Sequence, residues 1–250
     1  MLLSFSVMQK CSGVVLPLSL DSHLYDGEID VPCVSAPLSI AGPAGDLEAI
    51  TSLPLEIEAM RAVAVICHPH PLYGGTMANK VVHYMSRTFN EMGVGTLRFN
   101  FRGVGASAGS YAHGAGETED LLAVLDWIEE QYPGYAVWLA GFSFGAYIAL
   151  CGAGLRPVAR LITVAPPANL FDLNAVPLPS CPWLLIQGDQ DEIVPCDEVL
   201  DWVDSLARPP RVICMRGVDH FFHGHLNELR DKLKGALAPR ATKTGDAKVA

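Results

Sequence analysis

The middle of the chain alternates between continuous apolar runs and stretches whose apolar positions have helical spacing. Residues 62–67 have the sequence AVAVIC, which is typical of a strand buried on both faces. Residues 78–92 carry apolar side chains at the spacing of one helix face, and the alternation continues from there. The predicted strands are 62–67, 94–101, 136–141, 160–165, 183–187 and 211–215, and the predicted helices are 78–92, 117–131, 144–155, 197–206 and 224–237.

This alternation predicts an α/β fold with a mostly parallel central sheet and helices on both of its faces. Two short apolar segments, residues 36–41 and 47–53, flank a turn of Gly, Pro and Asp, which predicts an N-terminal β-hairpin. Residues 165–181 contain four prolines and are too few for a folded lid. We therefore expect no substantial lid over an active site.

Three regions follow from the same pattern. Residues 1–35 show no clear period and are expected to form a poorly ordered N-terminal arm. Residues 36–238 are expected to form a single α/β domain, and residues 239–250 a flexible tail. The length of 250 residues is enough for one such domain to bury a full sheet.

The charge and the cysteines limit the partners and the compartment. The net charge of −10 gives no electrostatic reason to bind nucleic acid or an anionic membrane. Seven cysteines, an odd number without regular spacing, argue against a disulfide framework and favour a reducing, cytoplasmic location. The sequence leaves open whether two copies pair as a homodimer.

Two apolar segments are long enough to resemble membrane signals. The first, residues 11–20, contains Pro17 and lacks a small-residue cleavage site, which argues against a secretory signal peptide. The second, residues 135–155, carries no charge but is interrupted by Gly141, Ser143 and Gly145. A buried strand, a turn and a helix explain the second segment better than a membrane span.

The strongest chemical signal is the sequence G-x-S-x-G at residues 141–145, between a predicted strand and a predicted helix. A sharp strand-to-helix turn holds the serine in a strained conformation, and glycines on both sides remove the Cβ atoms that would clash. Ser143 is therefore the candidate nucleophile. The alternative, a Gly/Ser turn without a catalytic role, is disfavoured by this strand–turn–helix setting.

A serine hydroxyl needs a base to attack at neutral pH, and the partners follow later in the chain, in the order acid and then histidine. His220 follows the last predicted strand and is the candidate base. Asp189, Asp191 and Glu192 follow the strand before it, and position alone does not separate these three acids as the group that orients the imidazole.

A hydrolase of this kind also needs two backbone N–H groups for the oxyanion. One is expected from Phe144, directly after the nucleophile. The other is expected from the loop after strand 62–67, where Pro69 and Pro71 have no N–H. His70 is the remaining donor nearest the strand end, with Leu72 and Tyr73 further along.

Other motifs are interpreted as structural. His68, His70, His220, His223 and His225 suggest a metal site, but they lack diagnostic spacing, and we expect no metal and no cofactor. The glycines of residues 100–105 do not follow the dinucleotide-binding pattern and indicate a turn. Glu117 and Asp120 are expected in the first turn of a helix, where acids complement its dipole.

Together these segments resemble the small, lidless bacterial α/β-hydrolases of the dienelactone-hydrolase-like type, over about residues 36–238. The resemblance implies Asp191 as the acid, His220 as the base and His70 as the second oxyanion donor. Dienelactone hydrolases themselves carry Cys where this chain has Ser143, so their substrate is not carried over. The segments are HPHPLYGGTM (68–77), NKVV (79–82), FNFRGVG (99–105), GFSFGA (141–146), GDQDEIV (188–194) and DHFF (219–222).

The expected function is that of a serine esterase that acts on small-molecule esters through an acyl-enzyme at Ser143. Two alternatives stay open at this point. One is a binding protein of the same fold without catalysis. The other is a cofactor-free perhydrolase or acyltransferase that uses Ser143, Asp191 and His220.

Overall fold

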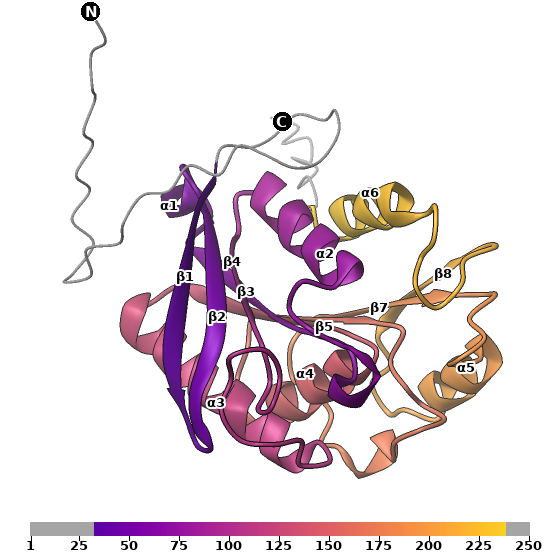
Figure 1. The fold of residues 1–250 in the computed structure, drawn as a ribbon. Helices are drawn as coiled ribbons and strands as arrows, with labels where there is room; N and C mark the ends of the chain where they lie inside the picture. The colour runs from indigo at the N-terminus through magenta and orange to yellow at the C-terminus, as the bar shows by residue number, and fades with distance from the viewer. Residues whose placement is uncertain (1–32, 239–250) are drawn as a thin grey trace, which may run out of the picture.

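The computed structural model describes residues 33–238 (Figure 1). Most of the predicted arm, residues 1–32, and the predicted tail, residues 239–250, lie outside the described residues. The first strand, β1 (Cys33–Gly42), begins three residues before the predicted domain boundary at residue 36, since its pairing with β2 (Gly45–Pro54) extends from Gly42 back to Cys33.

One eight-stranded sheet crosses the described part of the chain, in the order β1-β2-β4-β3-β5-β6-β7-β8. The predicted hairpin is confirmed, because β1 and β2 pair antiparallel and β2 then pairs antiparallel with β4. From β4 to β8 all neighbours are parallel. The remaining strands are β3 (Ala62–Cys67), β4 (Gly95–Phe99), β5 (Ala136–Phe142), β6 (Arg160–Val164), β7 (Trp183–Gly188) and β8 (Arg211–Met215).

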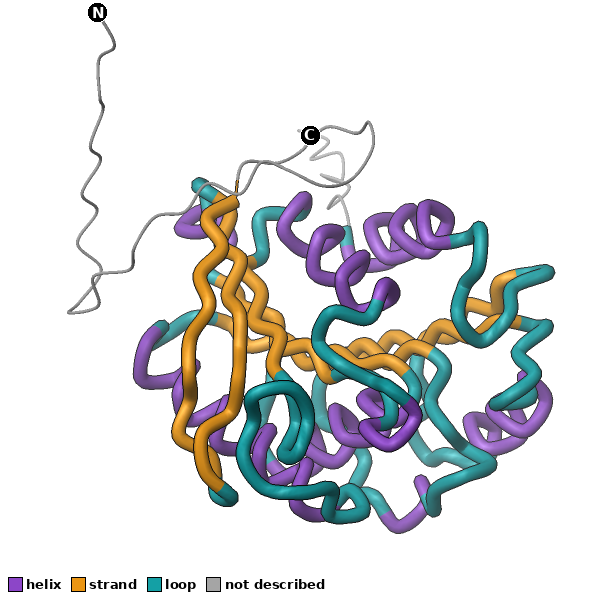
Figure 2. The backbone as a smooth tube through the Cα atoms, viewed as in Figure 1, coloured by secondary structure: helices purple, strands orange, loops and turns teal. Residues whose placement is uncertain are grey.

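Helices cover both faces of this sheet, as the alternation predicts (Figures 1 and 2). On one face α2 (Lys80–Glu91) and α6 (Leu226–Leu237) lie over a core that includes Met85, Phe89 and Leu229. On the other face α3 (Ala115–Gln131), α4 (Phe144–Leu155) and α5 (Cys196–Asp204) pack on a second core. Short helical turns that the pattern did not predict are α1 (Ile57–Met60), η1 (Pro71–Tyr73) and η2 (Leu173–Ala175).

Local contacts explain where an observed element departs from its prediction. Helix α3 begins two residues before Glu117, because the Glu117 carboxylate accepts the N–H groups of Ala112 and Gly114 and so caps the helix from its third position. Asp120 lies outside the first turn, which corrects the prediction: it is buried and forms a pair with Arg102, at 2.7 Å between Oδ1 and Nη2.

The apolar stretch 135–155 is divided between β5 and α4 with the turn at Ser143 between them, as predicted. Over residues 33–238, no helix has both the length and the apolar character that crossing a bilayer requires. The loop between β6 and β7 contains only the three-residue turn η2. Within residues 33–238, no folded lid is inserted between β6 and β7.

Candidate active site

The turn between β5 and α4 has the strained geometry that the G-x-S-x-G sequence predicts. Ser143 lies at φ 54° and ψ −122°, in a conformation that side-chain-bearing residues rarely adopt. A Cβ atom on Gly141 would lie 2.0 Å from the Gly145 carbonyl oxygen, and one on Gly145 would lie 2.2 Å from the Cys67 carbonyl oxygen. Both glycines are therefore required for α4 to start this close to β3 and β5.

The structure brings Ser143, His220 and Asp191 into one chain of hydrogen bonds. The Ser143 hydroxyl lies 3.1 Å from Nε2 of His220, and His220 Nδ1 lies 2.8 Å from Oδ2 of Asp191. Their sequence separations are 77 and 29 residues. All three side chains are buried, and Ser143 is the most accessible of them at 9 % exposure.

This arrangement assigns the imidazole proton. An ionised carboxylate only accepts hydrogen bonds, so Nδ1 of His220 donates to Asp191. Nε2 is then left as the acceptor for the Ser143 hydroxyl. The side chains are thus arranged for proton transfer from the hydroxyl to the imidazole.

The three candidate acids have different partners. Asp191 Oδ1 accepts the backbone N–H groups of Ile193 (3.0 Å) and Val194 (2.7 Å), while its Oδ2 faces His220. Asp189 instead accepts the N–H of Gly217 at 2.6 Å and joins the loops after β7 and β8. Glu192 reaches only the His220 backbone N–H, at 3.4 Å. Asp191 is therefore the acid that the geometry places on the imidazole.

Gln187 is a site residue that sequence reasoning missed. Its Nε2 donates to Asp191 Oδ2 at 3.0 Å and to the Val194 carbonyl at 2.9 Å, so it holds the acid loop from the end of β7. Its Oε1 is buried and has no hydrogen-bond partner among residues 33–238. The available signal was a polar side chain in the otherwise apolar sequence WLLIQG of a buried strand.

The side chains of the two predicted oxyanion donors, His70 and Phe144, are in contact. The His70 ring packs against the Phe144 ring with centroids 4.9 Å apart, and within the described chain neither backbone N–H donates a hydrogen bond. The His70 side chain is held on both sides: Nδ1 accepts the Leu72 N–H, and Nε2 pairs with the Tyr111 hydroxyl at 3.1 Å. The His70 ring is thus held in place, while its backbone N–H has no partner within residues 33–238.

His68 is a structural residue at the end of β3. Its Nδ1 lies 2.6 Å from the Pro69 carbonyl, and its Nε2 accepts the Phe101 N–H at 3.1 Å. Burial lowers the pKa of His68 to about 4, so the ring is neutral at pH 7. With both nitrogens occupied, His68 has no position left for a metal ion.

The other histidines of the metal hypothesis lie apart from this site. His223 pairs with Asp219, and His225 stands at the start of α6 near Glu228. Across residues 33–238, no three His, Cys, Asp or Glu side chains converge in a way that could hold a metal ion. The loop of residues 100–105 is structural, as predicted, with Asn100 bonded to Met77 and Glu48.

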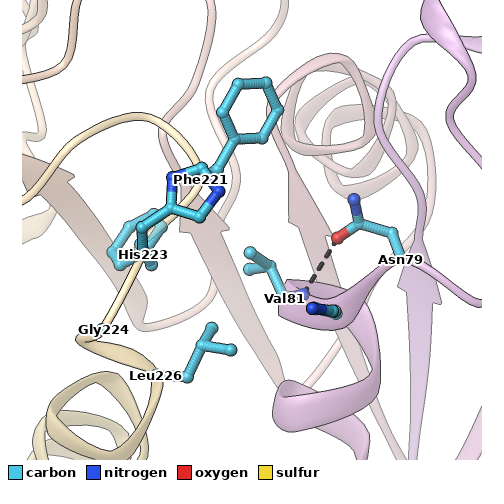
Figure 3. A pocket seen from close by; sticks show the side chains of 8 residues that line it. Asn79, Val81, Phe221, His223, Gly224 and Leu226 are labelled. Carbon is cyan, nitrogen blue, oxygen red and sulfur yellow. Dashed lines mark hydrogen bonds between the residues drawn. The ribbon is translucent and has the colours of Figure 1, made fainter.

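A cavity of about 300 Å³ lies between residues 221–226 and the start of α2 (Figure 3). Phe221 and His223 lie on one side of it, and Asn79 and Val81, from the start of α2, lie on the other. Phe221 is 42 % exposed, although it is aromatic. The residues directly after His220 therefore line a cavity, but Ser143, Asp191 and His220 are not among its lining residues.

Exposed apolar side chains occur on several loops at this edge of the sheet. We call Leu72, Tyr73, Leu170, Ile193 and Phe221 the apolar rim. They follow β3, β6, β7 and β8, and each is at least 39 % exposed. The Asn169 amide donates to the Ile193 carbonyl and so joins two of these loops. Apolar groups from separate loops at a strand-end edge are a common composition for a small-molecule site.

Comparisons with known proteins agree with the fold. A family model described as "alpha/beta hydrolase fold" matches residues 72–183. A solved α/β serine hydrolase without a lid, from Xanthomonas campestris, is 44 % identical, covers 80 % of this chain and 92 % of its own, and has a TM-score of 0.78. An α/β serine hydrolase homologue from Coxiella burnetii is 46 % identical, covers 87 % and 100 %, and also has a TM-score of 0.78.

An uncharacterized protein of Rickettsia prowazekii is 37 % identical over 70 % of this chain and 78 % of its own length. The chain therefore belongs to the α/β-hydrolase family, as the resemblance implied. This membership supports a hydrolase activity.

Proposed function

We propose that this protein is a serine esterase, in which Ser143 is the nucleophile, His220 the general base and Asp191 the residue that orients the base. The observation that carries the proposal is the continuous hydrogen-bonded chain from the Ser143 hydroxyl through His220 to Asp191. The strained turn supports it, because the strain is retained where a serine must stand clear of the sheet.

The proposed reaction begins when Ser143 Oγ attacks the ester carbonyl carbon while His220 Nε2 takes the hydroxyl proton. The negative charge on the carbonyl oxygen is stabilised by the N–H groups of Phe144 and His70. The imidazolium then gives its proton to the leaving alcohol, and the acyl group stays on Ser143. His220 Nε2 then takes a proton from water as the water oxygen attacks the acyl carbon. The proton passes to Ser143 Oγ, and the carboxylic acid leaves.

The surroundings favour esters that are neutral and at least partly apolar. The apolar rim provides exposed apolar side chains on the loops at this edge, and residues 33–238 contain no folded lid between β6 and β7. The net charge of −10 disfavours strongly anionic substrates at long range. Five cysteines of the described residues, Cys67, Cys151, Cys181, Cys196 and Cys214, are free thiols, which supports a reducing compartment such as the cytoplasm.

The experiment compares wild type with Ser143→Ala in fluorophosphonate labelling and in hydrolysis of p-nitrophenyl esters of increasing chain length. Wild type is expected to be labelled and active. Ser143→Ala should take no label, and its kcat/KM should fall by at least about 1000-fold. Circular dichroism provides the folding control.

Folded wild type that takes no label would indicate a binding protein and overturn the proposal. Faster acyl transfer to peroxide or alcohol than to water would indicate the perhydrolase or acyltransferase alternative.

A further inference from the structure

Two cysteines lie within contact distance where the loop after β7 meets the last strand. Cys196 is the first residue of α5, two positions after Val194 of the acid loop. Cys214 lies in β8, paired in register with Gln187 of β7. Their sulfur atoms are 3.7 Å apart. Residues separated by 18 positions along the chain therefore form a dithiol.

This pair differs in access from Cys67, the thiol buried in β3. Reagents in solution do not reach Cys67, and burial raises the pKa of its thiol far above the ordinary value. Cys214 is exposed and Cys196 is half-buried, so reagents in solution reach the pair. Burial, the adjacent Cys214 sulfur and nearby acids raise the pKa of Cys196 to about 12.

We propose that Cys196 and Cys214 are a modification site that forms a reversible disulfide with a low-molecular-weight disulfide as the oxidant. Disulfide formation requires the sulfurs to approach from 3.7 Å to a bond length of about 2 Å. The site is independent of the Ser143 chemistry, and its test does not depend on the esterase assignment.

The exchange with oxidised glutathione takes two balanced steps. The Cys214 thiolate attacks one glutathione sulfur, forms a mixed disulfide and releases one glutathione thiolate. Cys196 then attacks the Cys214 sulfur, loses its proton to solvent and expels the second glutathione. Two protein thiols are oxidised to one disulfide, and one glutathione disulfide is reduced to two thiols. The order follows from access, because Cys214 is the more exposed sulfur.

The cross-link would join the two segments that carry Asp191 and His220. These segments are already connected by hydrogen bonds from Asp189 N–H to the Met215 carbonyl, from Gln190 N–H to the Val218 carbonyl, and from Gly217 N–H to Asp189. A disulfide alongside them constrains the unfolded chain and leaves the native arrangement in place. The oxidised protein should therefore be more stable and keep its site.

The direct test is peptide mapping of the full-length protein after oxidation by glutathione disulfide, with digestion by trypsin under non-reducing conditions. Cleavage after Arg211 and Arg216 gives a short peptide with Cys214 alone, whereas the peptide of residues 161–211 holds both Cys181 and Cys196, because Arg208 precedes Pro209. Wild type is expected to give these two peptides joined. Cys181→Ser is the matched control and should keep the link, while Cys196→Ser should lose it.

A thermal melt supplies the second readout. Oxidised wild type is expected to gain about 5 °C in Tm, reversed by dithiothreitol, while Cys196→Ser gains nothing. The proposal is overturned if wild type stops at a stable glutathione adduct on Cys214, or if Cys196→Ser keeps the link to the peptide of residues 161–211. Either result leaves the Ser143 labelling experiment unaffected.

Discussion

The turn that carries Ser143 and the paired loops that carry Asp191 and His220 are built in different ways. The turn is fixed by close packing, since Gly141 and Gly145 leave no room for even one Cβ atom. The loops are fixed by hydrogen bonds, since the Asp191 carboxylate accepts two backbone N–H groups and also the side chains of Gln187 and His220. A single added methyl group should therefore disrupt the first region, and the loss of one polar partner the second.

Gly145→Ala should give the largest effect. Its new Cβ would meet the backbone of Cys67 at 2.2 Å, and backbone atoms of a central strand cannot move aside cheaply. We expect a loss of more than about 3 kcal/mol in the free energy of unfolding, or an insoluble protein. Urea denaturation measures it.

The control is Gly235→Ala in α6, where an added Cβ meets nothing within 4 Å. The free energy of unfolding of this variant should rise by about 0.5–1 kcal/mol, because alanine favours a helix more than glycine does. Equal stability of the two alanine variants would contradict the view that packing fixes the turn.

Asp191→Asn tests the loops. The asparagine amide can donate a hydrogen bond to Nδ1 of His220, whereas the carboxylate only accepts one. The imidazole therefore loses its correct tautomer, while the fold is kept. We expect kcat for a p-nitrophenyl ester to fall by about 1000-fold. Asp189→Asn and Glu192→Gln are the matched controls, because their carboxylates accept only backbone N–H groups. A comparable loss of kcat in either control would move the orienting role away from Asp191.

A further prediction concerns His68, whose backbone lies beside Gly145. Its pKa is lowered from 6.5 to about 4, so its contribution to stability is complete above pH 6.5 and is lost as the pH falls toward 4. Between about pH 7 and about pH 5, this titration lowers the free energy of unfolding by about 2 kcal/mol. Chemical denaturation of wild type and His68→Asn at both pH values measures it.

On acidification, the free energy of unfolding of the variant should fall by about 2 kcal/mol less than that of wild type, because the asparagine amide does not titrate. His70 and His83, whose pKa values burial also lowers, are present in both proteins and so cancel in the comparison. Identical pH dependence in the two proteins would show that His68 is not the group that titrates.

Features set by local packing were predictable from the sequence. The strand Ala62–Cys67 and the helix Phe144–Leu155 have the predicted bounds, because a continuous apolar run and two obligatory glycines leave few alternatives. The order of nucleophile, acid and histidine placed Ser143 and His220 at strand ends, and the fold brings these ends to one edge. The short helix Ile57–Met60 was missed, because four residues are too few to show a period.

Features that depend on contacts across the fold were not predictable from the residues alone. Asp189, Asp191 and Glu192 lie within one short loop, and only the folded loop shows which one faces the imidazole. The role of Gln187 depends on the same loop. The approach of Cys196 to Cys214 depends on the pairing of β7 with β8. The sequence around each cysteine does not predict this pairing.

The separation of 77 residues between Ser143 and His220 has a consequence for synthesis on the ribosome. The turn with its serine is made well before the acid and the base, and a hydroxyl without a base is a weak nucleophile at neutral pH. Nascent chains and fragments truncated before His220 should therefore be inert toward esters, even where the earlier strands have folded. The onset of hydrolysis would mark the moment when the last strand has joined the sheet.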